Sequence, residues 1–134
     1  MTAVIDSSAL VEHLLHLPLG PQVSALLKAH SGTVNVPQLL FPETVSAIKG
    51  IERASGASPL RCGQAVNRLM RLPVHQWNLK PLTPRVWQLR HSISTYDAYY
   101  VALAERLHAS LITKDARLAR AIEAAGLCPV DLIQ

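Results

Sequence analysis

The sequence is short of several residue types, and each shortage argues against a class of protein. Only two cysteines occur among 134 residues, Cys62 and Cys128, and neither belongs to a CxxC pair. We therefore expect neither a zinc site nor a disulfide framework, and free cysteines fit the reducing cytoplasm. No apolar run reaches the roughly 20 residues that span a bilayer, so we expect no membrane contact. The N-terminal "MTAVIDSSALV" lacks a basic segment and contains Asp6, which argues against a signal peptide.

Acidic residues are scarce too, at nine against 13 lysines and arginines. Residues 49–90 hold eight of the basic residues and a single acid, Glu52, which gives that stretch a net charge of +7. The rest of the chain holds five basic residues and eight acids, a net charge of −3. The basic stretch is either a set of ordinary solvated helix faces or a flank that binds a polyanion such as RNA. In the second case, the candidate RNA contacts are Arg68, Arg71 and Arg85.

Short apolar runs alternate with helical patterns along the chain, without internal repeats or linkers. We predict strands at 2–5, within 31–37, and at 73–79, 110–113 and 128–132, and helices at 7–15, 22–30, 38–55, 60–72, 83–93, 96–108 and 115–125. Thr83 is expected to be an N-cap, with Pro84 at the first helical position. Strands separated by helices pair in parallel through right-handed crossovers. The sequence thus predicts one α/β domain over residues 1–134, an open parallel sheet flanked by helices on both faces.

Four acids fall where helices begin beside this predicted sheet. Asp6 comes directly after a predicted strand, and Asp115 lies two residues after another. Glu43 and Asp97 lie near the starts of two helices. Each acid alone has a simple structural explanation, as a helix cap or as a charge that suits the helix dipole. Together, however, these helices begin at the carboxyl edge of the sheet, where ligand sites of such folds lie, so we expect the four carboxylates to gather along one rim.

A cluster of four carboxylates predicts a bound cation, because like charges repel strongly at a low effective dielectric. Ligands that are all oxygen favour Mg²⁺ or Mn²⁺. Lys114 is a candidate to pair with Asp115 instead. A divalent ion beside a basic stretch suits phosphodiester hydrolysis, because the ion polarises a phosphoryl oxygen and lowers the pKa of a bound water. The other five acids are assigned to the surface: Glu12, Glu52, Glu105, Glu123 and Asp131.

The chain carries four ordered segments, "AVIDSSALV", "VPQLLFPETVSAI", "LRHSISTYDAYYVALAE" and "LITKDARLARA". Together they resemble the PIN-domain toxins of the VapC type over nearly the whole chain. The combination of "YDAYYVALAE" with "LITKDARL" is specific, whereas "DSSALV" alone is weak. The resemblance implies a PIN-like fold and a metal-dependent endoribonuclease toxin of a type II toxin–antitoxin system, held silent by a VapB-type antitoxin. It also implies a homodimer, and RNA products with 5′-phosphate and 3′-hydroxyl ends.

The resemblance also implies roles for individual residues. Thr113 matches a small hydroxyl position ahead of the last acid, where it would orient a water ligand or a carboxylate. Ser46 stands where the family often has Asn, and its shorter side chain would give the ligands weaker support. Arg117 stands where the family often carries a further acid, which argues against a second metal ion. The family's catalytic and metal-binding acids correspond to Asp6, Glu43, Asp97 and Asp115.

Two other functions fit parts of the pattern. A catalytically silent RNA-binding or scaffold module would share the fold, but it would not need an intact set of four acids. A receiver domain also uses Mg²⁺ at the edge of a parallel sheet, but its phosphoacceptor Asp follows the central third strand. The corresponding segment here, "PVHQWNLK", contains no acid. A receiver domain is therefore disfavoured.

Two apolar features leave alternatives open. The leucines of the first helix and its exit either pack in the core or form a self-complementary dimer patch; they are Leu10, Leu14, Leu15, Leu17 and Leu19. Three tyrosines surround Asp97, and we expect them to be buried, with one a candidate to line the substrate path. They are Tyr96, Tyr99 and Tyr100.

Overall fold

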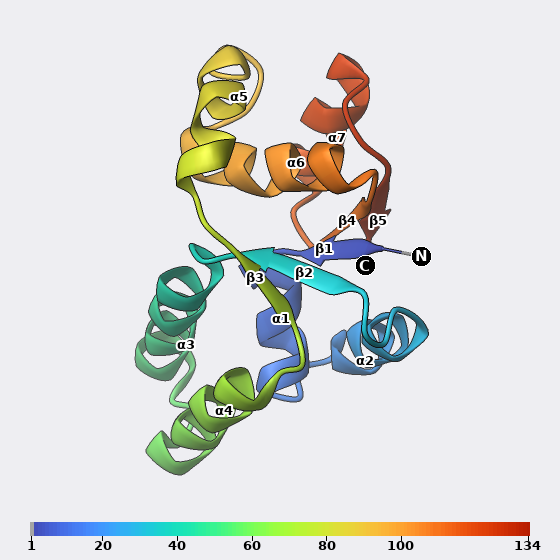
Figure 1. The fold of residues 1–134 in the computed structure, drawn as a ribbon. Coiled ribbons are helices and arrows are strands. Elements are labelled where there is room, and N and C mark those ends of the chain that lie inside the picture. The colour runs from blue at the N-terminus through green and yellow to red at the C-terminus, as the bar shows by residue number, and fades with distance from the viewer. Residues whose placement is uncertain (1) are drawn as a thin grey trace.

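A parallel sheet of five strands runs through the middle of the structure, a computed structural model that describes residues 2–134 (Figure 1). The strands are β1 (Ala3–Ile5), β2 (Val34–Pro37), β3 (His75–Trp77), β4 (Ser110–Thr113) and β5 (Val130–Leu132). Their order is β3-β2-β1-β4-β5, and every neighbouring pair is parallel. The central strand β1 is completely buried, whereas the edge strand β3 is largely exposed. All five carboxyl ends therefore lie along one edge of the sheet.

Helices cover both faces of this sheet, as the sequence predicts (Figure 1). One face carries α1 (Ser7–Leu14), α2 (Gly20–Ala29), α3 (Leu40–Ser55) and α4 (Pro59–Arg71). The other carries α5 (Thr83–Gln88), α6 (Thr95–Leu107) and α7 (Ala116–Ala125). The predicted α/β architecture and its twelve elements are confirmed. Within residues 2–134, none of the helices has the length and the apolar character needed to cross a bilayer.

The order of the strands reverses at the centre of the sheet. The chain leaves β1 towards β2 through helices on one face, and it leaves β4 towards β5 through α7 on the opposite face. The two connections diverge from adjacent strands, which makes the carboxyl ends of β1 and β4 the topological switch point of the sheet. Asp6 follows β1 directly, and Asp115 lies two residues beyond β4. The topology thus places two of the predicted acids at the usual ligand site of an open α/β sheet.

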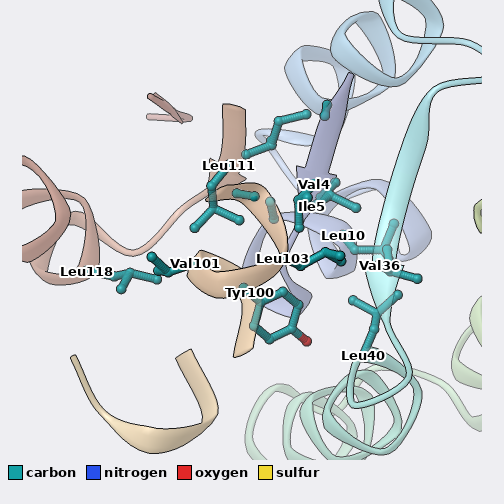
Figure 2. Packing of buried hydrophobic residues seen from close by; sticks show 14 of the residues in the cluster. Val4, Ile5, Leu10, Val36, Leu40, Tyr100, Val101, Leu103, Leu111 and Leu118 are labelled. Carbon is teal, nitrogen blue, oxygen red and sulfur yellow. The ribbon is translucent and has the colours of Figure 1, made fainter. Parts of the chain in front are cut away.

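Helix α6 is buried in the core over its central part. Its residues from Ala98 to Ala104 are buried except Tyr99, which is half-buried. Figure 2 shows Tyr100, Val101 and Leu103 packing among side chains of β1, β4 and neighbouring helices. A helix that is apolar on nearly all sides belongs inside the protein, which explains the apolar run "AYYVALA". This burial fixes the start of α6, and with it Asp97, against the sheet.

The predicted helix at 83–93 is the least accurate of the sequence assignments. The structure ends α5 at Gln88, and a 3₁₀ turn, η1 (Lys80–Leu82), leads directly into it. Thr83 is therefore not the N-cap, which is Leu82. The Thr83 hydroxyl donates instead to the carbonyl oxygen of Leu79, at 3.1 Å, because the chain is already helical at this point. Pro84 lies in the first turn, but at the second helical position and not at the first as predicted.

The prediction that the other five acids lie on the surface is wrong for Glu12. Only 4% of this residue is exposed. Its carboxylate accepts a hydrogen bond from the N–H of Leu19 at 3.1 Å and pairs with the Lys114 ammonium at 3.2 Å. Gly20 lets α2 approach at this point, because a Cβ there would lie 2.6 Å from the carbonyl oxygen of Glu12. Lys114 thus pairs with Glu12 and not with Asp115, contrary to the prediction.

Candidate active site

Asp6 lies at the junction of β1 and α1 and is the most buried of the predicted acids, with 5% of the residue exposed. It is the N-cap of α1 and accepts a hydrogen bond from the N–H of Ala9 at 3.1 Å on Oδ1. The Ser8 hydroxyl donates to the same oxygen at 2.7 Å, and the Thr113 hydroxyl donates to Oδ2 at 2.5 Å. Asp6 therefore caps α1, as its simple structural explanation expects. A helix cap alone would not require the burial of Asp6 or its hydrogen bond from Thr113 of β4.

Thr113 links the two central strands at the predicted site. Its hydroxyl donates to Asp6 and accepts a hydrogen bond from the N–H of Asp115 at 3.0 Å. Asp115 in turn is the N-cap of α7 and accepts from the N–H groups of Arg117 and Leu118, both at 3.0 Å, through Oδ1. The threonine therefore orients one carboxylate and the backbone of the next. This is consistent with the supporting role that the sequence predicts for it.

Asp97 occupies the first turn of α6 and is half-buried. Ser94 is the N-cap residue, but its hydroxyl makes no bond to a helix N–H; it donates to Oδ2 of Asp97 at 2.8 Å. A carboxylate three residues after the N-cap also interacts favourably with the helix dipole. The local sequence "SISTYDA" thus fixes Asp97 at the helix start, on the same edge of the sheet as Asp6.

Glu43 reaches the site from the first turn of α3, which follows β2. Its Oε1 accepts a hydrogen bond of 2.5 Å from the hydroxyl of Tyr100, on α6. Ser46 lies one turn further along α3, is exposed, and lines a hollow together with Glu43. In the part of the chain that the structure describes, no hydrogen bond joins Ser46 to any of the four acids. Its supporting role stays a prediction.

The four carboxylates interact electrostatically, although each is held by its own partners. Burial raises the pKa of Asp6 to about 6, and the charge of Asp97 adds to this against the lowering effect of its hydrogen bonds. Burial raises the pKa of Glu43 as well, with a contribution from Asp97. Burial and the charge of Asp115 raise the pKa of Asp97. Asp97 therefore interacts electrostatically with each of the other three acids.

The fold leaves these acids without neutralising partners. Between residues 2 and 134 there are two ion pairs, Lys114 with Glu12 and Arg85 with Glu105, and neither involves the four acids. Three of the acids also leave one oxygen without a hydrogen bond from any described residue: Glu43 Oε2, Asp97 Oδ1 and Asp115 Oδ2. Such oxygens are the donors that Mg²⁺ and Mn²⁺ prefer.

The side chains do not, however, form a closed ligand set as they stand. No group of three or more His, Cys, Asp or Glu residues in the described chain is close enough together to hold an ion. Unscreened repulsion among carboxylates favours such a spread arrangement. The donor set therefore suits a hard divalent ion in its chemistry, and the carboxylates would have to move closer to share one.

Two hollows flank the acids on the surface. One, of about 390 Å³, is lined by polar side chains from α6 and α7, including Asp97, Asp115 and Arg117. The other, of about 630 Å³, lies between α3 and the start of α6 and is mainly apolar; its lining includes Glu43 and the largely exposed ring of Tyr96. Tyr96 thus departs from the expectation of burial and becomes the tyrosine that can line a substrate path.

The predicted RNA contacts have mixed surroundings. Nη1 of Arg68 donates to the carbonyl oxygen of Leu14 at 2.7 Å, at the end of α1 opposite Asp6. A helix of eight residues is about 12 Å long, so this guanidinium is held away from the acids. Arg85 makes two hydrogen bonds to Glu105, of 2.8 and 2.9 Å. Arg71 is exposed at the end of α4. An RNA contact by Arg68, Arg71 or Arg85 remains a prediction.

Arg117 is a basic residue beside the acids that is not among the RNA contacts predicted from the sequence. It is exposed, and within the described chain it is the one basic side chain that lines either hollow beside the acids. Its place two residues after Asp115, in the first turn of a helix that begins at the carboxyl edge, was a usable signal. In the sequence, the family resemblance marks this position only by the absence of a further acid.

Comparison with known proteins gives a consistent family. Residues 3–123 match the PIN domain family. The ribonuclease VapC12 of Mycobacterium tuberculosis is 39% identical to this chain over 117 residues, which are 87% of this chain and 89% of that protein. The VapC ribonuclease Mb0985 of Mycobacterium bovis is 32% identical over 130 residues, or 97% of each chain.

Solved structures share the fold at lower identity. VapBC2 from Rickettsia felis, bound to a DNA fragment from its promoter, gives a TM-score of 0.70 at 12% identity, with complete coverage of both chains. VapC20 of Mycobacterium tuberculosis, described as a Sarcin-Ricin loop cleaving toxin, gives a TM-score of 0.68 at 16% identity, covering 94% of this chain and 96% of that one. With the family match and the identities above 30% over most of its length, this chain belongs to the PIN domain family, among the VapC proteins.

Proposed function

We propose that this chain is an endoribonuclease toxin of a type II toxin–antitoxin system and depends on Mg²⁺ or Mn²⁺. One observation carries the proposal: four carboxylates, Asp6, Glu43, Asp97 and Asp115, lie along the carboxyl edge of the sheet without an ion-pair partner among the described residues. Such an arrangement is costly for a fold unless a cation offsets it. The relatives at 32–39% identity are named VapC ribonucleases, which supports RNA as the substrate.

The residues of the chain would bind and orient the reactants. Glu43, Asp97 and Asp115 would hold the ion through their unpaired oxygens, and Asp6 through remaining lone pairs, since a carboxylate oxygen can accept more than one bond. A bound Mg²⁺ or Mn²⁺ ion would polarise a phosphoryl oxygen and lower the pKa of an attacking water. Thr113 would keep the Asp6 carboxylate in place through the bond between their side chains. Arg117 would hold a phosphate of the RNA at the rim of the polar hollow.

A VapB-type antitoxin is the proposed partner, because structural neighbours include the VapBC2 and FitAB assemblies. We propose the cytoplasm as the compartment, since cellular RNA is the substrate. A homodimer is also proposed, and the leucines of the first helix and its exit are used mainly in the core of the chain. Leu10, Leu14 and Leu15 are in the core, and Leu17 and Leu19 pack against it. The described large apolar side chains that remain exposed lie elsewhere: Val45, Leu60, Met70, Trp87 and Tyr96.

The structure disfavours the receiver alternative on topology as well as on sequence. Receiver domains have the strand order 2-1-3-4-5, in which the third strand is central. Here β3 is an edge strand, and no acid follows it before η1. A catalytically silent module remains the competing proposal. A silent module would cleave no RNA. RNA cleavage that is lost when one of the four acids is replaced would identify a ribonuclease.

We expect brief induction of the chain in a bacterial host to arrest growth and to produce discrete new 5′-phosphate ends in cellular RNA. Mapping these ends would also identify the target. Asp6→Asn should remove both effects, because it lowers the charge of the ion site while keeping a side chain that caps a helix equally well. Glu123→Gln, an exposed acid on α7, is the matched control and should behave as wild type.

Co-expression of the product of the neighbouring gene should restore growth if that product is the antitoxin. Arrest without RNA cuts, or cuts that persist in Asp6→Asn, would reject the proposed activity. Normal growth together with failure to bind the neighbouring product would reject the toxin–antitoxin assignment.

We expect Arg117→Ala to weaken RNA binding and to reduce its salt dependence. Loss of one phosphate contact to a single strand should lower the slope of log K against log salt by about 0.7. Binding would be measured in EDTA, so that cleavage does not interfere. Arg120→Ala is the matched control, since Arg120 is exposed on the same helix and lines neither hollow. Equal slopes for Arg117→Ala and wild type would place the phosphate contact elsewhere.

A further inference from the structure

The hydroxyl of Tyr100 connects the buried core to one carboxylate of the site. The residue is 1% exposed, and its ring packs among core side chains near Leu40 and Leu103 (Figure 2). The hydroxyl donates to Oε1 of Glu43 at 2.5 Å, which joins α6 to α3 across 57 positions of sequence. A buried phenol needs a hydrogen-bond partner, but a backbone carbonyl would satisfy it equally well. The choice of an acid of the site as partner calls for a further explanation.

Glu43 differs from the other acids in how it is held. Asp6 and Asp115 accept bonds from N–H groups of their own helices, and Asp97 accepts one from a residue three positions away. Glu43 has the longest side chain of the four. Within residues 2–134, the carboxylate of that side chain accepts one hydrogen bond, which comes from Tyr100. A flexible side chain loses more rotamer freedom when it is held in one geometry. Its placement therefore depends on a contact from another element.

Tyr100 bonds to Glu43 and lies on the same helix as Asp97. Residues three apart share one face of a helix, and Tyr100 lies three residues after Asp97 on α6. The bond occupies Oε1 of Glu43 and leaves Oε2 available. The Tyr100 hydroxyl is the donor in this bond, because an ionised carboxylate oxygen can only accept. The rigid helix that carries Asp97 thus also sets the position of Glu43.

We propose that Tyr100 is a positioning residue of the site, which holds the Glu43 carboxylate towards the other three acids and so prepares it to bind a divalent cation. This inference rests on the proposed ribonuclease function, and it adds a residue that acts through Glu43 and does not touch RNA. Partners of this kind, behind a ligand, typically contribute about 10–100-fold to metal affinity or activity.

Tyr100→Phe tests the inference, with Tyr99→Phe as the matched control. Tyr99 lies on the same helix, is half-buried, and donates or accepts one hydrogen bond of 3.0 Å with Thr83, away from the acids. We expect Tyr100→Phe to lower kcat by about tenfold or more with little change in KM for RNA, and to raise the Mn²⁺ concentration needed for thermal stabilisation. Tyr99→Phe should leave both quantities close to wild type.

A double-mutant cycle with Glu43→Ala distinguishes positioning from a general loss of structure. If Tyr100 acts through Glu43, then Tyr100→Phe has no further effect on the Mn²⁺ dependence once Glu43 is alanine. An equal effect in both backgrounds, or identical behaviour of Tyr100→Phe and Tyr99→Phe, overturns the inference. If the wild type binds Mn²⁺ but cleaves no RNA, the ribonuclease proposal fails, while the Mn²⁺ titrations still decide the role of Tyr100. If the wild type shows no Mn²⁺ response, both proposals fail.

Discussion

Asp97→Asn is expected to abolish RNA cleavage, with a loss that reaches the detection limit of the assay. Asp97 links the site electrostatically: its charge acts on Asp6 and Glu43, and it is itself affected by Asp115. The change removes a ligand oxygen and part of the negative charge that would hold the ion. Cleavage of an RNA substrate by the purified variant, in excess Mg²⁺ or Mn²⁺, measures the effect. Glu123→Gln, exposed on α7, controls for the loss of one acid.

The same variant separates a shared ion from a simple helix-start role for Asp97. In EDTA, Asp97→Asn should melt at a higher temperature than wild type, because it relieves repulsion among like charges. In excess Mg²⁺, wild type should gain stability by mass action and the variant should gain little. A helix-start role predicts a loss of only about 0.3–1 kcal/mol in EDTA and an unchanged response to Mg²⁺. Observation of that second pattern would show that Asp97 does not share an ion.

Asp6→Asn should stabilise the metal-free protein at neutral pH. The pKa of Asp6 is raised from 3.8 to about 6 in the folded chain, mainly by burial. A shift of this size corresponds to roughly 3 kcal/mol between the two protonation states. Since the folded pKa lies above the unfolded one, the protonated form is favoured by folding. The contribution of Asp6 to stability is therefore complete below about pH 3.8 and is lost as pH rises through about pH 6.

Denaturant unfolding in EDTA at several pH values between 4 and 7 measures this effect. The stability of Asp6→Asn minus that of wild type should increase by about 2.4 kcal/mol across this range, because asparagine does not titrate. Asparagine also caps helices about as well as aspartate, so the loss of the cap should contribute little. Excess Mg²⁺ should reduce or reverse the difference by stabilising the wild type. A difference that does not change with pH would mean that Asp6 is ionised at no cost to the fold.

The local features of this protein are readable from its sequence because they depend on neighbouring residues. The predicted strands and helices are all present, since apolar periodicity and the caps Asp6 and Asp115 act over a few positions. The helix predicted at 83–93 does begin at Thr83, but its N-cap and its end differ from the prediction, because a 3₁₀ turn before it and a chain reversal after it leave little local pattern. The acids were predictable as a group because parallel strands place their carboxyl ends on one edge.

Interactions between distant segments could not be read in this way. Glu12 has the same helical setting as an exposed acid, and its burial depends on Leu19 and on Lys114, 102 positions away. Arg68 and Arg85 carry the charge expected of RNA contacts, but their guanidinium groups bond within the protein, to Leu14 and Glu105. A count of charges along the chain cannot distinguish these cases, because the partner of each residue is set by packing.

The sequence by itself therefore determined the α/β architecture, the family resemblance and the four acids that end on one edge of the sheet. The tertiary structure alone decided the strand order that places Asp6 beside β4, the bond from Tyr100 to Glu43, and the position of Arg117 in the polar hollow. The physical reason is range. Backbone preferences and caps act over a few residues, whereas these contacts join segments that are far apart in the sequence and are brought together by the packing of α6 and the sheet.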